Sequence, residues 1–80
     1  MVGFQVDIFE GEDEDPTLTH IFWGKTKADA VGVSRAHEKT DKFYAGAVQS
    51  GEWEGIPLVI EETWLDDEGN AADEDELEDE

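Results

Sequence analysis

The chain contains no cysteine, two prolines and only five basic residues among its 80. Without cysteine it forms neither a disulfide framework nor a thiolate metal site. Its apolar runs, such as Leu58 to Ile60, are far too short to cross a bilayer. No basic leader followed by an apolar stretch begins the sequence, so no signal peptide is predicted. Together these absences favour a soluble, cytoplasmic protein that does not associate with membranes.

Acidic residues are the feature that the chain has in excess. The chain has 23 Asp and Glu residues and only five Lys and Arg residues, which gives a formal net charge of −18. Ten of the acids fall in residues 66–80, and the thirteen in residues 1–65 still leave that part at about −8. Such a charge favours partners with a basic surface, and most basic surfaces in a cell hold nucleic acid. Direct binding to nucleic acid or to an anionic membrane is not expected.

Three segments have the patterns of β-strands. Residues 2–9 alternate between apolar and polar positions, residues 17–23 are rich in β-branched and aromatic side chains, and residues 57–65 alternate again. The apolar positions of the first segment are Val2, Phe4, Val6 and Ile8. Residues 10–16 form a strongly acidic loop, and residues 52–55 are predicted to be a turn that carries Trp53.

Helix signals lie between the second and third of these strands. Thr26 with Asp29 three residues later is typical of a helix N-terminus, and the helix should run to about Glu38. Thr40-Asp41 is a second cap signal, and a following apolar pattern ends at Gly51. The sequence leaves open whether this is one bent helix or two short ones.

This order predicts an α+β fold, ββ(α)αβ. We expect a three-stranded antiparallel sheet of order 2-1-3, with one or two helices covering one face. Residues 1–68 form the single domain, in a size range where stability is marginal. Residues 69–80 are nearly all acidic or small, and we expect them to be a disordered tail because they bury too little surface to offset the entropy of ordering.

No motif predicts a catalytic, metal or cofactor site. The two histidines, His20 and His37, share no ligand spacing, and His37 is expected to line the boundary between helix and sheet. An EF-hand loop that began at Asp66 would need Gly at position 71 and Glu at position 77, where the chain has Ala71 and Leu77. No cysteine nucleophile and no distinct acid–base pair is present. We therefore expect a non-enzymatic protein without metal or cofactor.

The chain resembles small proteins of phages and other mobile elements. The residues that carry this resemblance lie between about 17 and 60, and are Phe22-Trp23-Gly24-Lys25-Thr26, Ala36-His37, Thr40-Asp41-Lys42-Phe43 and Gly55-Ile56-Pro57-Leu58. Its size, acidity, ββαβ order and lack of an active site resemble anti-CRISPR proteins. That resemblance implies binding to the DNA-recruiting part of a CRISPR effector complex without catalysis, and it assigns no site residues.

Two functions of different classes follow from the charge. The first is an inhibitor of a basic nucleic-acid-binding protein, in which carboxylates stand where phosphates would lie. The second is an accessory or assembly protein whose charge serves solubility or the binding of a basic partner. Either would act in the cytoplasm, that of the host cell if a phage encodes it, as a monomer or dimer.

The inhibitor hypothesis assigns partner-binding roles to two acidic segments and one tryptophan. They are Glu10, Glu12, Asp13, Glu14 and Asp15, then Asp66, Asp67 and Glu68, and Trp53. A Trp among acids is typical of an interaction hot spot, although packing in the core is the more ordinary role for two of the three tryptophans. The two acidic segments form one continuous edge only if they lie at the same end of the sheet, which the sequence leaves open.

Overall fold

The central strand of the protein is β1 (Val2–Glu10), as its alternating sequence predicts. The computed structural model describes residues 1–77. One side of β1 is buried, with Val2 5%, Phe4 6%, Val6 2% and Ile8 0% exposed. β1 pairs antiparallel with β2 (Leu18–Gly24) along one edge and with β4 (Ile56–Leu65) along the other. The α+β class and the order of the three long strands are therefore confirmed.

Within residues 1–77 the sheet has five strands, so the prediction of three is wrong in number. β3 (Glu52–Trp53) pairs with the start of β4, and β5 (Ala71–Ala72) pairs with its end. The strand order of the sheet is β2-β1-β4-β3, with β5 beside β4. Residues 52–55 were predicted to be a turn only. The turn itself is Glu54-Gly55, with φ angles of 49° and 84°, as in the two-residue hairpin turn with positive φ at both positions. Two-residue strands are too short to show alternation in a sequence.

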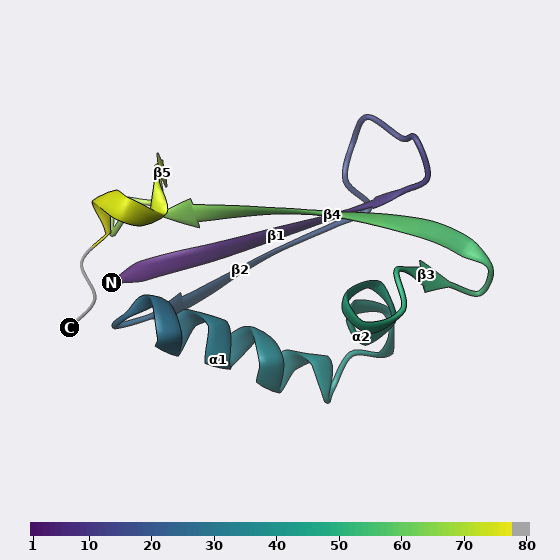
Figure 1. The fold of residues 1–80 in the computed structure, drawn as a ribbon, viewed down its shortest axis with the longest axis horizontal. Coiled ribbons are helices and arrows are strands. Elements are labelled where there is room, and N and C mark those ends of the chain that lie inside the picture. Colours follow the sequence, from purple (N-terminus) through teal and green to yellow (C-terminus); the bar gives the residue numbers. More distant parts are fainter. Residues whose placement is uncertain (78–80) are drawn as a thin grey trace.

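Two helices cover one face of the sheet (Figure 1). In α1 (Lys27–Glu38), the Thr26 hydroxyl accepts a hydrogen bond from the Asp29 N–H, so the predicted N-cap is confirmed. In α2 (Lys42–Gln49), the Asp41 carboxylate accepts one from the Tyr44 N–H. α1 packs on β2 and β1, whereas α2 lies near β3 and β4. No helix within residues 1–77 is long and apolar enough to span a membrane.

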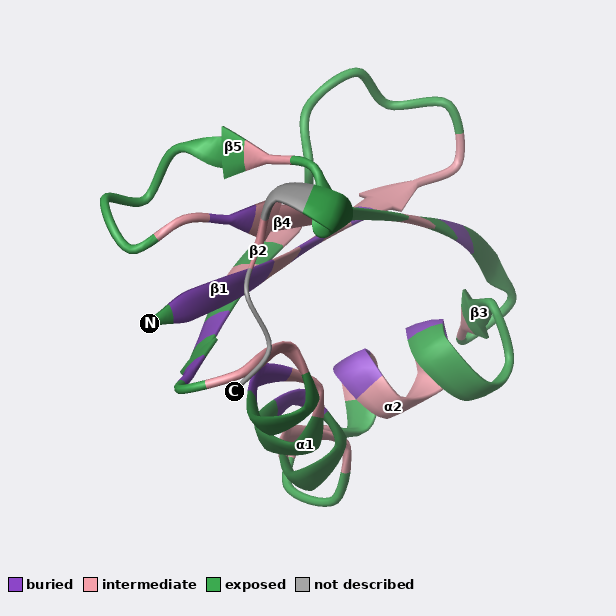
Figure 2. Cartoon of the chain, turned by 60° about the vertical axis from the view of Figure 1, so that its left-hand side comes forward, coloured by how far each residue is buried: buried purple, intermediate pink, exposed green. Residues whose placement is uncertain are grey.

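The core lies between this helical layer and the sheet (Figure 2). It contains Phe4, Val6, Ile8, Phe22, Ala30, Tyr44, Ala47 and Leu58. α1 approaches the sheet closely at Gly24, where an added Cβ would lie 2.5 Å from the backbone nitrogen of Ala30. Towards β4 the layers separate, and a groove of about 460 Å³ runs between α1, α2 and the side chains of Ile60, Glu62 and Trp64.

Part of the predicted tail has regular structure. After β5 comes a 3₁₀ turn, η1 (Glu74–Glu76). The Lys27 Nζ at the start of α1 donates a hydrogen bond of 3.2 Å to the Glu74 carbonyl. Disorder of residues 69–80 in solution stays a prediction, as does the domain boundary at residue 68, and residues 78–80 lie outside the described part of the chain.

Candidate partner-binding surface

The charges are divided unevenly along the chain. All five basic residues fall within residues 25–42, which comprise α1 and the segments next to it. Only Asp29, Glu38 and Asp41 are acidic there, so this stretch carries a formal charge of +2, and the other 20 of the 23 acids have no base among them. The negative charge is therefore concentrated outside the helical layer rather than spread evenly.

The acid loop, residues 10–15, rises from the sheet on the side opposite the helices (Figure 1). Backbone hydrogen bonds fix its ends: the Gly11 N–H donates to the Pro57 carbonyl at 2.8 Å, and the Thr17 N–H donates to the Ile8 carbonyl at 2.8 Å. The carboxylates of four acidic residues are exposed and have no hydrogen-bond or ion-pair partner within residues 1–77; these are Glu12, Asp13, Glu14 and Asp15. The loop thus presents unneutralised charge on an anchored backbone.

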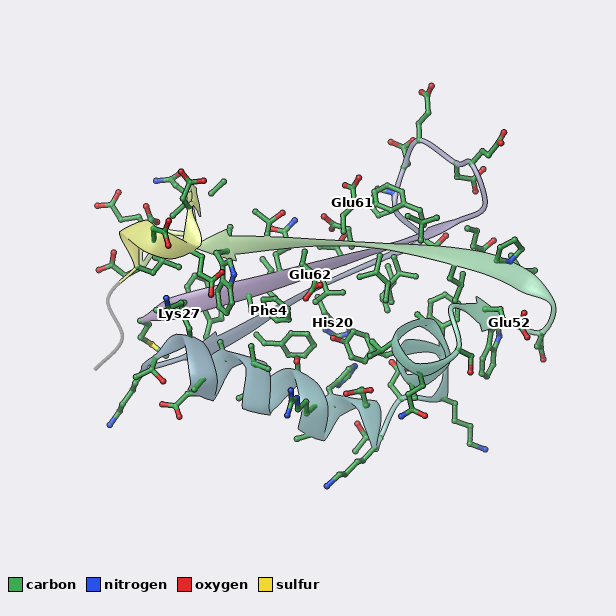
Figure 3. The ribbon with its side chains drawn as sticks, in the orientation of Figure 1. Phe4, His20, Lys27, Glu52, Glu61 and Glu62 are labelled. Carbon is green, nitrogen blue, oxygen red and sulfur yellow. The ribbon has the colours of Figure 1, made fainter. Side chains whose placement is uncertain are left out.

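A shallow hollow of about 410 Å³ lies between the acid loop and the open face of the sheet, the face that no helix covers. Its apolar lining comes from Phe9 of β1 and Val59 of β4, which is 50% exposed. Its acidic lining comes from three loop residues and one strand residue, Glu12, Asp13, Glu14 and Glu61. Figure 3 shows Glu61 on the side of the acid loop and Glu62 on the side of the helices. Apolar surface next to carboxylates suits Lys and Arg, whose side chains combine an aliphatic stem with a cationic end.

Asp7 adds a second strand carboxylate beside Glu61. The two residues are register partners across β1 and β4, so their side chains emerge from the same face. Asp7 accepts hydrogen bonds from the Thr19 hydroxyl at 2.7 Å and from the Gln5 amide at 3.1 Å. Glu61 has no such partner within residues 1–77. Like charges directly opposite one another destabilise a sheet, so a cationic partner would relieve a repulsion that exists in the free protein.

The acid turn, Asp66, Asp67 and Glu68, lies at the other end of the sheet. Because β1 and β4 are antiparallel, the end of β4 lies beside the start of β1, where Gly3 pairs with Leu65. Glu10 pairs with Leu58, so seven residues of β1, or roughly 24 Å, separate the two ends at about 3.4 Å per residue. The two predicted acidic segments therefore do not form one continuous edge.

Within the acid turn, Asp66 has a structural role. Its Oδ1 accepts hydrogen bonds from the N–H groups of Glu68 at 3.0 Å and Asn70 at 2.9 Å. Gly69 has a φ of 85°, which glycine adopts without strain. Asp67 and Glu68 are exposed and have no side-chain partner within residues 1–77. They are the members of this turn that remain available to a partner.

Trp53 packs against α2 instead of joining either acidic segment. Its ring meets that of Phe43 edge-on, with 5.9 Å between centroids, and a Cβ added at Gly46 would lie 3.2 Å from it. Trp23 is the most exposed tryptophan, at 38%. It lies on the open face over Gly3, where an added Cβ would meet both the Trp23 ring and Leu65 at 3.0 Å.

Strand alternation could have identified the residues that the sequence reasoning missed. Asp7 and Glu61 occupy outward positions on strands one and three, which the predicted order 2-1-3 already places side by side. Runs of consecutive acids in the sequence mark acidic loops, but they do not include acids such as these, which pair across two strands. The pairing of Asp7 with Glu61 could therefore have been predicted from the sequence, whereas the hollow beside the acid loop could not.

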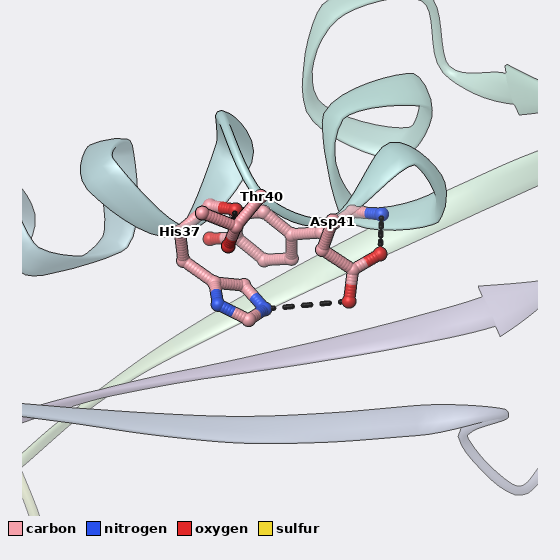
Figure 4. A network of polar contacts seen from close by, with 4 residues as sticks. His37, Thr40 and Asp41 are labelled. Atoms are coloured by element: carbon pink, nitrogen blue, oxygen red, sulfur yellow. Dashed lines mark hydrogen bonds and ion pairs between the residues drawn. The ribbon is translucent and has the colours of Figure 1, made fainter.

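A different set of polar residues meets where α1, α2 and β2 converge. His20 of β2, His37 in the last turn of α1 and Asp41 at the N-cap of α2 each offer one ligand atom, and these atoms lie within 4.8 Å of one another. His37 Nε2 lies 3.4 Å from Asp41 Oδ2 (Figure 4). Within residues 1–77 this contact is an ion pair rather than a hydrogen bond, and the buried Nε2 has no hydrogen-bond partner.

Electrostatics and packing hold this cluster in place. The Tyr44 N–H bonded to Asp41 lowers the pKa of that carboxyl, and the charge of His37 and the Phe43 N–H lower it further. Burial raises the pKa of the Tyr44 hydroxyl, so the phenol stays neutral. The ring centroids of His20 and His37 lie 4.3 Å apart, and the rings of Phe22 and Tyr44 are in contact with both. The cluster thus pairs an ionised carboxylate with two imidazoles.

Comparison of the chain with protein-family models, with curated proteins and with solved structures finds no match. Any assignment of function therefore rests on the residues and geometry described above.

Proposed function

We propose that the protein is a non-enzymatic inhibitor, encoded by a phage, that binds a basic DNA-binding surface of a host defence complex. In this proposal the carboxylates of the acid loop and Glu61 take the positions of DNA phosphates. The single observation that carries it is the hollow on the open face, where these acids surround Phe9 and Val59 while all five bases lie in residues 25–42. An even coat of acids that served solubility alone would need no such separation.

Opposite charges would bring the partners together quickly. A one-signed surface steers a basic partner during diffusion and raises the association rate, and salt screens that attraction. The anchored backbone of the acid loop lowers the entropy that is lost when the complex forms. We expect fast, strongly salt-dependent association with a partner that otherwise binds DNA in the host cytoplasm.

The second candidate is a small acidic accessory protein whose charge serves solubility or the assembly of a basic partner. Residues 69–80, rich in acids, favour it. The two candidates differ in which carboxylates matter. A shaped mimic depends on the position of the loop acids, whereas an accessory protein depends on total charge and on the tail.

Charge reversals of equal size at different positions test this. The tagged protein is used to capture its partner from host lysate at low salt, and the purified partner is then loaded with labelled duplex DNA. We measure the concentration of each variant that releases half of the DNA. Asp13→Lys with Glu14→Lys changes the charge of the acid loop by four, and Asp73→Lys with Asp75→Lys changes that of the tail by the same amount.

The loop variant should require at least about ten times more protein than the wild type, which corresponds to about 1.4 kcal/mol of lost binding. The tail variant should require less than about three times more. Asp67→Lys with Glu68→Lys, at the far end of the sheet, should also have the smaller effect. Equal losses in all three variants, or a loss confined to the tail variant, would reject shaped mimicry in favour of the accessory function. Far-UV circular dichroism checks that each variant is folded.

A further inference from the structure

We propose that His20, His37 and Asp41 form a binding site for a divalent transition metal such as Zn²⁺. The site lies where β2, the end of α1 and the start of α2 converge, and it is independent of the acid loop. Two imidazoles and one carboxylate, with a fourth position for water, make up a ligand set that Zn²⁺ accepts. Imidazole nitrogen also favours zinc, copper and nickel over calcium and magnesium.

The distance between two of the ligands already fits a metal ion. Four ligands arranged tetrahedrally at about 2.0–2.1 Å from Zn²⁺ lie roughly 3.3–3.4 Å from one another. His37 Nε2 and Asp41 Oδ2 are 3.4 Å apart. The third ligand atom, from His20, lies within 4.8 Å of both. To reach the tetrahedral spacing of about 3.3 Å, it needs to move closer by at most about 1.5 Å.

The buried nitrogen of His37 supports a ligand at this position. Its Nε2 is inaccessible to solvent and has no hydrogen-bond partner in the described part of the chain, residues 1–77. A buried polar atom without a hydrogen bond destabilises the folded state, and the ion-pair contact with Asp41 Oδ2 at 3.4 Å offsets this only in part. A metal bound to Nε2 would remove that cost, since the lone pair would then bond to the cation.

The position of Asp41 at the start of α2 orients its carboxylate for metal binding. Its Oδ1 accepts the hydrogen bond from the Tyr44 N–H at 3.1 Å, which fixes the orientation of the carboxylate. Its Oδ2 is the oxygen that faces His37. Hydrogen bonds from neighbouring groups commonly orient metal ligands in this way, so the N-cap interaction and metal binding use different oxygens of one side chain.

A metal at this site would join three elements that also meet here through the rings of Phe22, Tyr44 and the two histidines. A structural metal is one of the devices that stabilise small domains without disulfides. Binding therefore stabilises the folded state, because the unfolded chain does not hold the three ligands together.

Titration of the full-length chain with Zn²⁺ tests the proposal. Excess Mg²⁺ is included to compete with Zn²⁺ for surface carboxylates, because Mg²⁺ binds oxygen ligands and does not compete well for imidazole. Isothermal titration calorimetry should show one Zn²⁺ per chain, and the melting temperature should rise with added Zn²⁺. Asp13→Asn with Glu14→Gln, which removes two carboxylates remote from the cluster, should leave the affinity unchanged.

Two conservative substitutions probe the ligands themselves. Asp41→Asn keeps an acceptor for the Tyr44 N–H, since Asn is an equally good N-cap, and His20→Phe keeps an aromatic ring against Phe22. Each should weaken Zn²⁺ binding by at least about 100-fold, because loss of an outer-shell partner alone costs about 10–100-fold. Wild-type affinity in both variants, or no Zn²⁺ binding in excess Mg²⁺, would overturn the proposal.

A measurement on the wild-type chain covers the case in which a variant fails to fold. The ring resonances of both histidines should shift as one equivalent of Zn²⁺ is added, and Co²⁺ should show the visible absorption of a four-coordinate site with nitrogen ligands. Unchanged histidine signals would overturn the proposal even if Zn²⁺ bound elsewhere on the surface.

Discussion

The two faces of the sheet differ in both burial and charge. The face beneath α1 and α2 holds Val6 and Ile8, which are 2% and 0% exposed, whereas on the open face Ile21 and Val59 are 43% and 50% exposed. The acid loop and Glu61 also lie on the open side (Figure 3), while the bases lie in residues 25–42. Most of the core and the acids proposed to contact a partner therefore lie on opposite faces of the sheet.

Replacing one isoleucine on each face should give the largest difference in unfolding free energy between the two faces. Ile8→Ala should lower the free energy of unfolding by about 2–5 kcal/mol, because it leaves a cavity in the core. That is a large part of the 5–15 kcal/mol typical of small domains. Ile21→Ala removes the same atoms from the open face and should cost less than about 1 kcal/mol.

Urea unfolding of both isoleucine variants, followed by circular dichroism, gives the two free energies. A loss for Ile21→Ala as large as that for Ile8→Ala would mean that the open face is buried in solution, for example against a second copy of the chain. The distinction between the faces would then not hold for the protein in solution.

Two glycines test the contact between the sheet and the helical layer. Gly24→Ala places a Cβ 2.5 Å from the backbone nitrogen of Ala30 and should destabilise the fold by about 1–3 kcal/mol. At Gly32, on α1, an added Cβ would meet nothing within 4 Å in residues 1–77 apart from its chain neighbours and the backbone of its own helix, so Gly32→Ala should stabilise the protein by about 0.5–1 kcal/mol. Thermal melts measure both, and the close packing of α1 on β2 would be in doubt if the two substitutions shifted the melting temperature in the same direction.

Single charge reversals should give the smallest effects, with opposite signs for the two regions. The wild type should melt at a higher temperature as salt increases from low to moderate concentration, because ions screen repulsion beyond a Debye length of about 10 Å. At low salt, Glu12→Lys should raise the free energy of unfolding and Lys25→Glu should lower it, each by a few tenths of a kcal/mol, and the melting temperature should shift in the same direction. A melting temperature that is insensitive to salt would show that the acids are locally compensated.

Local patterns were sufficient to predict the long elements. The alternation of Val2, Phe4, Val6 and Ile8 predicted β1 and its buried side, and Thr26 and Asp41 predicted the starts of the two helices. β3 and β5 were missed because two residues show no periodicity. Each exists only because β4 offers it a partner, which is a tertiary effect.

The candidate sites were harder to predict because they combine residues from separate elements. The opposite placement of the acid loop and acid turn followed from an antiparallel order already predicted, but the sequence reasoning left it open. His37 and Asp41 are four residues apart, yet their relation to His20 depends on how α1 packs over β2. No spacing rule relates a strand residue to a helix end 17 residues later.

The three tryptophans give each region its own optical reporter. Trp23 lies over Gly3 on the open face, Trp53 meets Phe43 beside α2, and the Trp64 ring lies 4.9 Å from that of Phe4 at the groove. Indole emission depends on the polarity around the ring, so variants that retain one tryptophan would report separately on these places. A partner that extends from the acid loop along the open face to Gly3 would then change the emission of Trp23, while a metal bound by His20, His37 and Asp41 would leave it unaltered.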